Sequence, residues 1–594
     1  MTIFNNLIYI FLLKSVVYLY LMGIPKFFRY ITDKYENIIV ENITDLNNLF
    51  FDLNCLIHPC VHNVIKRFPI LVKKYNNSLY SDHIDLITEF ESEVYKEISE
   101  YINYLIEFSK PNKLIYFAID GVAPRSKMKQ QRYRRYRSVM EKEKIKNIEQ
   151  KYNKITYKLD TNCITPGTIF MKKLSNFLKT YLTELQKKIE IQIILDDSGI
   201  RGEGEHKILQ FIKEKCVQDV NCIYGLDADL IMLALVCNSD RVYLLREAIH
   251  FGKVDMKELL YFNVNLFSEK LYESITTPIM HKYEILTTDI DDVNELEIER
   301  NRIIKDYICL CFLVGNDFLP HIPGISINNK GIDILLDIYI NNYVIKPYYL
   351  VNENNTINFI FLKQIITKLY ANEEELLRKS QKKTDRFRPR LQYNNNFELE
   401  LSKLNYYPVF NKSKLLKYGY SDWRDKYYKY YFHITNSHKN AELLNNICKN
   451  YVDGLQWTCY YYFDKCISYS WFYKYNAGPT LKDLCKYLLK RVYPPSFDDI
   501  EFLPFEQLAI VLPKQSNHLW CKSFRDLSKT NKNISIKYPT KCKLDLLNHV
   551  YLHECEPLLS IIDNDLIKGV FSNIKLSEEE KILNEKTELF ILDS

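Results

Sequence analysis

Residues 114–120 read Leu-Ile-Tyr-Phe-Ala-Ile-Asp, an unbroken apolar run that ends in an acid. Three more short apolar runs end in the same way, at residues 48–52, 191–197 and 222–227. Continuous apolar runs of this length are typical of strands that are buried on both faces of a parallel sheet. Charged stretches with helical spacing, such as residues 92–108 and 171–188, lie between the runs. The alternation predicts an α/β fold with a mostly parallel central sheet flanked by helices.

The acids around these runs form a candidate active site. In an open α/β sheet, ligands bind at the carboxyl ends of the strands. Six acids end four predicted strands or lie just beyond them: Asp52, Asp120, Glu203, Glu205, Asp227 and Asp229. Asp317, in the segment 314–320, is the seventh candidate. Because carboxylates two residues apart face the same way in extended backbone, we expect both acid pairs, at 203/205 and 227/229, to point into one crevice.

Seven carboxylates in one crevice repel each other strongly unless cations lie among them. Carboxylate oxygens suit Mg²⁺ or Mn²⁺. Two such ions about 3.5–4 Å apart clamp the attacking and leaving oxygens of a phosphodiester displacement. A single strand-end acid is as readily a helix cap or turn residue, but that alternative accounts poorly for all the sites together. The pattern therefore predicts magnesium-dependent phosphodiester hydrolysis.

A strongly basic helix is predicted beside these acids. Residues 125–137 carry seven positive charges and no acid, and the segment begins five residues after Asp120. At helical spacing, one face presents Lys127, Gln131, Arg134 and Arg135. Such a face holds a phosphate through charge-assisted hydrogen bonds. A solvated helix or a localisation signal is the alternative, but solvated faces usually mix charge signs. An anion pocket beside a metal site suggests that a terminal phosphate is held while the adjacent linkage is cut.

Composition adds general limits. The formal charge of +6 over 594 residues does not by itself indicate a nucleic-acid binder. The 15 cysteines include no Cys-x-x-Cys pair, which is typical of a reduced intracellular protein. Nothing distinguishes cytoplasm from nucleus or indicates a protein partner. Residues 7–21 are mostly apolar, but a spanning helix needs about 20 apolar residues, so we expect no membrane association.

We divide the chain into five parts by composition and motif density. They are an apolar extension that we expect to be dispensable (1–21), a catalytic domain (22–350), a linker or insertion (351–400), a helical, aromatic-rich lobe (401–560) and a tail with one helix (561–594).

Seven segments in this order resemble the Xrn family of 5′→3′ exoribonucleases. They are residues 22–28, 52–60, 118–132, 162–168, 202–207, 224–229 and 315–321. The resemblance begins at Met22, reaches about residue 340 with family-like spacing, and continues more weakly to about residue 560. It implies a fold like that of PIN and 5′-nuclease domains. The chain departs from the family at Cys55, where glycine is usual, and at Leu53, and neither change removes an expected ligand.

The resemblance implies a role for each candidate residue. The seven acids would bind the metal ions, and Lys127, Gln131, Arg134 and Arg135 would bind a 5′ phosphate. A His and a Trp of the family sandwich the first base, and His58 and Trp471 are our matches, with Trp457 as the next candidate. The implied function is processive 5′→3′ hydrolysis of single-stranded RNA with a 5′ monophosphate to nucleoside 5′-monophosphates, by two metal ions.

Two other functions remain open from the sequence. A structure-specific 5′ flap endonuclease on DNA shares the carboxylate-rich chemistry, but residues 323–328 depart from the helix-hairpin-helix turn expected there. An inactive RNA-binding scaffold is the second alternative, and the complete set of acids argues against it. A zinc site at Cys55, His58, Cys60 and His62 is also conceivable, although its spacing is too tight for a usual finger.

Overall fold

A computed structural model describes residues 27–68, 84–154, 160–250, 253–287, 296–411, 416–418, 421–435, 440–490 and 492–593. The apolar extension at residues 1–21 lies outside these ranges, so the expectation for it stays a prediction.

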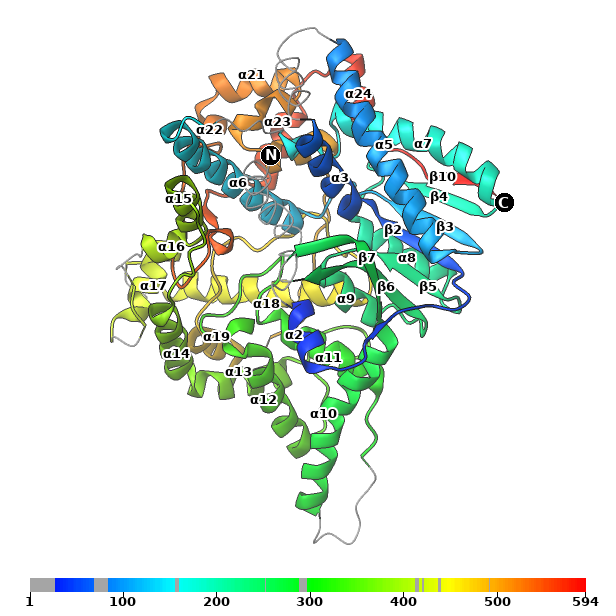
Figure 1. Cartoon of the computed structure of the whole chain (residues 1–594). Helices are drawn as coiled ribbons and strands as arrows, with labels where there is room; N and C mark the ends of the chain where they lie inside the picture. The colour runs from blue at the N-terminus through cyan, green and yellow to red at the C-terminus, as the bar shows by residue number, and fades with distance from the viewer. Residues whose placement is uncertain are drawn as a thin grey trace.

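An eight-stranded sheet lies at the centre of the molecule, in the order β1-β7-β6-β5-β2-β3-β4-β10 (Figure 1). The five strands from β6 to β4 are parallel, and antiparallel pairs complete the two edges. The strands are β1 (Ile39–Val40), β2 (Asn48–Asp52), β3 (Leu114–Ala118), β4 (Gln192–Asp196), β5 (Asn221–Tyr224), β6 (Val242–His250), β7 (Lys253–Asn263) and β10 (Phe590–Leu592). The predicted mostly parallel sheet is confirmed, and each of the four apolar runs contains or overlaps a strand.

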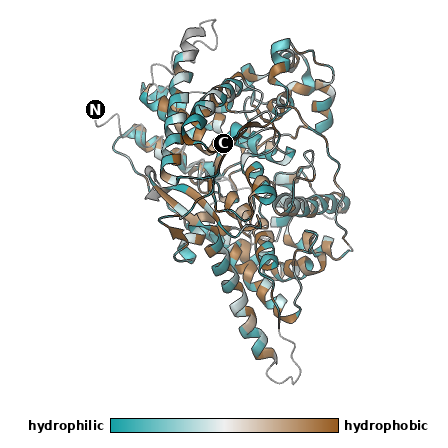
Figure 2. Cartoon of the chain, turned by 90° about the vertical axis from the view of Figure 1, so that its right-hand side faces the viewer, coloured by the Kyte–Doolittle hydropathy of each residue, from teal (hydrophilic) through white to brown (hydrophobic). Residues whose placement is uncertain are grey.

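Both faces of the sheet are covered, which explains why the runs are unbroken. Leu49 and Phe51 belong to a buried cluster on one face, and Phe50 and Tyr116 belong to a second cluster on the other. The first face packs on α3 (Leu53–Arg67), α5 (Ile84–Ser109) and α7 (Ile169–Ile189). The second packs on α2 (Phe27–Lys34), α8 (Gly204–Lys215), α9 (Ala228–Leu235), α10 (Val264–Thr287) and α11 (Arg300–Phe312). In Figure 2, brown and teal alternate along the helices that surround the sheet.

A long basic helix and a helical second half complete the molecule. The basic segment forms α6 (Arg125–Lys151), as predicted. The later helices are α12 (Gly331–Ile345), α13 (Phe359–Ala371), α14 (Glu373–Arg386), α15 (Asn396–Asn405), α16 (Tyr407–Phe410), α17 (Trp423–Phe432), α18 (Ala441–Phe463), α19 (Leu481–Leu488), α20 (Pro504–Val511), α21 (Lys522–Thr530), α22 (Lys532–Ser535), α23 (Asn564–Phe571) and α24 (Glu578–Leu583). Short 3-10 turns lie at Thr161–Cys163, Ile327–Asn329, Lys514–Leu519 and Leu552–Glu554, and β8 (Lys543–Leu544) pairs with β9 (Pro557–Leu558).

The two halves share one apolar core. Trp457 of α18 is fully buried and lies in the same cluster as Phe50 of the sheet. Phe312, at the end of α11, packs on Tyr462 with ring centroids 5.0 Å apart. The aromatic residues of the helical half therefore bury themselves against the sheet domain.

Residues 351–400, which we expected to be a linker or insertion, are largely helical. They include α13, α14 and the beginning of α15. Leu376 and Leu377 are buried on the inner side of α14. Within α14, two apolar side chains among charged residues give too weak a pattern to predict this anchoring from sequence.

Residues 561–594 also differ from the tail that we expected. They contain two helices, α23 and α24, and the edge strand β10. In β10, Ile591 pairs with Ile194 of β4. The partner strand lies about four hundred residues earlier, so no local pattern indicates this pairing. Within the described ranges, no helix is long and apolar enough to cross a membrane.

Candidate active site

Parallel strands bring three acids to one edge of the sheet. Asp52 is the last residue of β2, while Asp120 and Asp227 follow β3 and β5 closely. Phe51 is in register with both Phe117 and Tyr224, so the strands end level with one another.

Each of the two acid pairs lies at the beginning of a helix. Glu203 is the residue before α8 and Glu205 is in its first turn. Asp227 and Asp229 hold the same positions at α9. The expectation of extended backbone across each pair was therefore wrong, because only the first member is extended. A helix N-terminus favours negative charge, so this placement stabilises the carboxylates.

The seventh acid, Asp317, comes from the loop that follows α11. Gly315 adopts a φ of 98° there. A Cβ on Gly315 would lie 2.9 Å from the backbone nitrogen of His321, so the tight loop requires glycine. The neighbouring Phe318 packs on α18, with its ring centroid 5.0 Å from that of Tyr461. The helical half thus fixes the loop that carries Asp317.

Asp52 and Asp120 are held by a small network of hydrogen bonds. Asn54 donates its side-chain amide to Asp120 Oδ2 at 2.6 Å and its backbone N–H to Asp52 Oδ1 at 3.2 Å. The backbone N–H of Gly204 donates to Asp120 Oδ1 at 2.7 Å. A Cβ on Gly204 would approach Asp52 Oδ1 to 3.1 Å, so glycine at 204 lets α8 begin against the two carboxylates. Cys55, a departure from the family pattern, donates its thiol to Asp52 Oδ2 at 3.0 Å.

The ammonium group of Lys127 lies among the acids. Its Nζ is 2.5 Å from Glu203 Oε2 and 2.8 Å from Asp317 Oδ2, and the lysine is buried. Although burial opposes the charge, Asp317 and Glu203 raise the pKa of Lys127 well above its usual value. This lysine, predicted to bind a phosphate, therefore balances part of the carboxylate charge.

Burial and mutual repulsion perturb the acids. Burial, and then the charge of Asp120, raise the pKa of Asp52 to about 7. Burial and Asp317 raise the pKa of Asp229 to about 8. The pKa values of Glu205 and Asp227 are raised well above their usual range, chiefly by burial. A nearby cation favours the ionised form of such buried carboxylates and so lowers their pKa values.

The donor set suits hard cations, although the arrangement is not a preformed metal site. Among the described residues, no three His, Cys, Asp or Glu side chains are placed so that they could already hold a metal ion. Glu205 Oε2, Asp227 Oδ1 and Asp229 Oδ1 are buried oxygens with no hydrogen-bond partner among the described residues. Buried carboxylate oxygens of this kind are what Mg²⁺ or Mn²⁺ would satisfy. The placement of Cys55, His58, Cys60 and His62, all within the described ranges, likewise gives no support to a zinc site.

Sequence reasoning missed two tyrosines of α18 that contact the acids. Tyr461 donates its hydroxyl to Glu203 Oε1. Tyr462 hydrogen-bonds Asp229 and thereby lowers the pKa of that acid, against the larger effect of burial. The Tyr461 ring stacks on Trp457 at a centroid distance of 4.9 Å. The chain has 47 tyrosines, so residue type alone gave no signal.

The predicted basic face of α6 lies beside His58 of α3. Burial, followed by the charges of Arg134, His62 and Arg135, lowers the pKa of His58 to about 3. Arg135 donates to the Thr165 hydroxyl at 2.8 Å. Burial, and then Arg134, lower the pKa of Arg135 to about 9. The fold thus brings a neutral histidine and two arginines together.

Gln131 lies one helical turn from Arg135 on α6 and is buried, and its Oε1 has no partner among the described residues. Its position fits the predicted anion pocket. That Lys127, Gln131, Arg134 and Arg135 bind a phosphate stays a prediction.

Of the two tryptophan candidates, only Trp471 remains. It is half-buried and stacks on Trp457 at 5.3 Å. Trp457 is fully buried, and its indole N–H donates to the Ser468 carbonyl at 3.0 Å. A base cannot reach that ring, so Trp457 is excluded. A base sandwich between His58 and Trp471 stays a prediction.

Comparisons with known proteins agree with this geometry. The family model described as XRN 5′-3′ exonuclease N-terminus matches residues 22–248. The model described as Xrn1 helical domain matches residues 297–414 and 410–593, and so covers the helical half.

Curated relatives align along nearly the whole chain. The 5′-3′ exoribonuclease 1 of Saccharomyces cerevisiae is 30% identical over 95% of this chain and 44% of its own length. That of Homo sapiens is 29% identical over 96% of this chain and 35% of its own length. The 5′-3′ exoribonuclease 2 of Arabidopsis thaliana is 26% identical over 96% and 69%, respectively. The chain therefore spans less than half the length of the two exoribonuclease 1 relatives.

Proposed function

Because the chain belongs to the XRN 5′-3′ exonuclease family, we propose that it hydrolyses RNA stepwise from the 5′ end. The finer proposal is processive digestion of single-stranded RNA with a 5′ monophosphate, releasing nucleoside 5′-monophosphates. Its main support is the juxtaposition of the seven acids, at the carboxyl edge of the sheet, with the basic face of α6.

The acids and Lys127 would have different roles: the acids bind the metal ions, and Lys127 positions two of the acids. The seven acids would hold two Mg²⁺ or Mn²⁺ ions, and the unpartnered oxygens of Glu205, Asp227 and Asp229 support this assignment. Such ions activate water and stabilise the leaving oxygen of a phosphodiester. Lys127 keeps Glu203 and Asp317 in place by its ion pairs. Buried hydrogen-bond partners restrict the carboxylates to one arrangement. This lowers the entropic cost of positioning the reactants for in-line attack.

Substrate selection would depend on α6 and the stacking residues. Arg134 and Arg135 suit a 5′ monophosphate, since a guanidinium binds phosphate through two parallel hydrogen bonds. His58, held neutral beside them, offers a ring face to the first base, and a ring face accepts any base. The sequence-independent contacts support processive digestion.

The test compares the wild type with Asp227→Ala on RNA labelled at either end. We expect the wild type with Mg²⁺ to release mononucleotides from the 5′ end of 5′-monophosphorylated RNA, and to leave a DNA flap uncut. Asp227→Ala should abolish cleavage and largely retain RNA binding, because α6 is untouched. Cleavage of the flap but not of the RNA, or near-normal turnover of the variant, would contradict the proposal.

We also propose that the protein acts inside the cell. All 15 cysteines are free, and most are buried. Fractionation of cells that express a tagged chain tests this location and separates cytoplasm from nucleus.

A further inference from the structure

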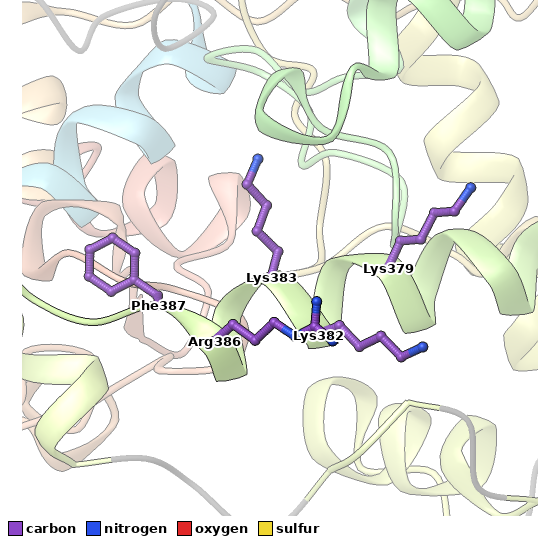
Figure 3. Close-up of a pocket in the computed structure, with 5 residues that line it drawn as sticks. All are labelled: Lys379, Lys382, Lys383, Arg386 and Phe387. Atoms are coloured by element: carbon purple, nitrogen blue, oxygen red, sulfur yellow. The ribbon is translucent and has the colours of Figure 1, made fainter.

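A second basic surface lies on α14, a different helix from α6. Residues 378–390 carry seven positive charges and one acid, Asp385. Lys379, Lys382, Lys383 and Arg386, with Phe387, line a hollow of about 460 Å³. In Figure 3, Lys379 and Lys383 extend to the same side of the helix. We call these five residues the α14 surface.

The charges of the α14 surface are only partly balanced. Lys379 pairs with Glu375 at 2.6 Å. Lys382 and Arg386 are exposed and have no ion-pair partner within the described ranges. The four cations are spaced three or four residues apart, where like charges on a helix destabilise it. A polyanion laid across the hollow relieves this repulsion.

The α14 surface is joined to the loop of the active site. Leu377 of α14 lies against Gly324, since a Cβ there would be 3.3 Å from Leu377 Cδ2. Lys383 donates to the carbonyl of Asn328. Both contacts lie in the segment that begins at Asp317. Asn328 comes eleven positions after Asp317, so their Cα atoms are at most about 40 Å apart.

Aromatic rings accompany the cations. Phe387 is half-buried, 5.8 Å from the ring of Tyr406. Basic grooves that carry aromatic side chains are typical of proteins that bind single-stranded nucleic acid without sequence preference.

From this arrangement we propose that the α14 surface binds the phosphate backbone of the RNA beyond the nucleotides held in the active site. This inference rests on the proposed use of RNA as substrate. The surface adds affinity for long RNA through charge, and it plays no part in hydrolysis. The α14 surface adds no affinity for a short RNA that fills only the active site.

The experiment measures the affinity of the full chain for RNA in EDTA, with RNAs of about 6 and about 40 nucleotides. The variant Lys382→Ala/Arg386→Ala should bind the long RNA about tenfold more weakly at low salt. Its salt dependence should fall by about 1.4 in log–log slope, because two phosphates are no longer neutralised. Its affinity for the short RNA, and its cleavage of that RNA with Mg²⁺, should match the wild type.

The matched control is Lys482→Ala/Lys486→Ala, which removes two exposed lysines at the same spacing from α19. An equal loss of affinity in this control would show an effect of net charge and would overturn the proposal. So would an unchanged slope in the α14 variant. If the wild type binds long RNA as expected but cleaves none with Mg²⁺, the proposed function fails while the α14 surface stands.

Discussion

At the scale of single residues, neighbours decide what a charged side chain can do. Lys127 and Arg134 belong to the same helix. Lys127 reaches the acids and pairs with Glu203 and Asp317, whereas the charge of Arg134 acts on His58. The helical spacing predicted that both face the site, but it did not distinguish the lysine that balances acids from the arginine beside the ring.

Arg134→Ala should reduce selection of the 5′ end. Each charge-assisted contact contributes roughly 1.5–3 kcal/mol, so the rate on 5′-monophosphorylated RNA should fall by about one to two decades. The rate on 5′-hydroxyl RNA should change much less, because that contact is already absent. The measurement is the ratio of the two rates.

Lys146→Ala is the control, since it removes an exposed charge from the same helix. A ratio that Arg134→Ala leaves unchanged would show that this face of α6 does not read the 5′ end.

At the scale of elements, α18 couples the helical half to the acids. The Tyr461 ring stacks on Trp457, and its hydroxyl donates a hydrogen bond to Glu203. In Tyr461→Phe the ring stays and the hydrogen bond is lost. Since a hydrogen bond to a charged group contributes about 1.5–3 kcal/mol, we expect kcat to fall by one to two decades. The Mg²⁺ concentration needed for half-maximal activity should rise.

The control is Tyr460→Phe, a change on the half-exposed side of the same helix. A loss of thermal stability in Tyr461→Phe with an unchanged Mg²⁺ dependence would assign Tyr461 to packing alone.

Glu373 anchors the beginning of α14, and its titration should appear in stability. It is buried and accepts the backbone N–H of Leu481 at 2.6 Å. Burial raises its pKa from 4.5 to about 7. The stability that this group contributes is complete below pH 4.5 and is lost as the pH rises through 7, because only the unfolded chain releases its proton readily.

The glutamine of the Glu373→Gln variant does not titrate, so the variant does not lose this stability as the pH rises. From pH 4.5 to 8, its free energy of unfolding should rise relative to the wild type by up to about 3 kcal/mol. Urea denaturation at several pH values measures the difference. A difference that stays constant with pH would show that Glu373 titrates normally in the folded protein.

At the scale of the whole molecule, the base sandwich that we propose would join the two halves. His58 comes from α3 beside the sheet, and Trp471 comes from the loop after α18. Trp471→Ala should therefore make digestion less processive, because stacking on an aromatic ring contributes about 1–3 kcal/mol per base. RNA should dissociate between steps at least about fivefold faster. The measurement is the length distribution of products under single-encounter conditions.

Trp471→Phe retains a ring and should restore most of the processivity. Equal processivity of the alanine variant would exclude Trp471 from the path of the RNA.

The sequence by itself determined the four parallel strands at the centre of the sheet and the acids that lie at or beyond their ends. Apolar runs as long as residues 114–120 require burial on both faces, and the acids at their ends share one edge because parallel strands end together. Only the tertiary structure decided that Lys127 lies among the acids, that Tyr461 reaches Glu203, and that β10 pairs with β4. These contacts could not be predicted because the residues that form them are far apart in the sequence. Periodicity and capping act over a few residues, whereas these contacts join residues about 76 to 400 positions apart, and folding of the whole chain brings them together.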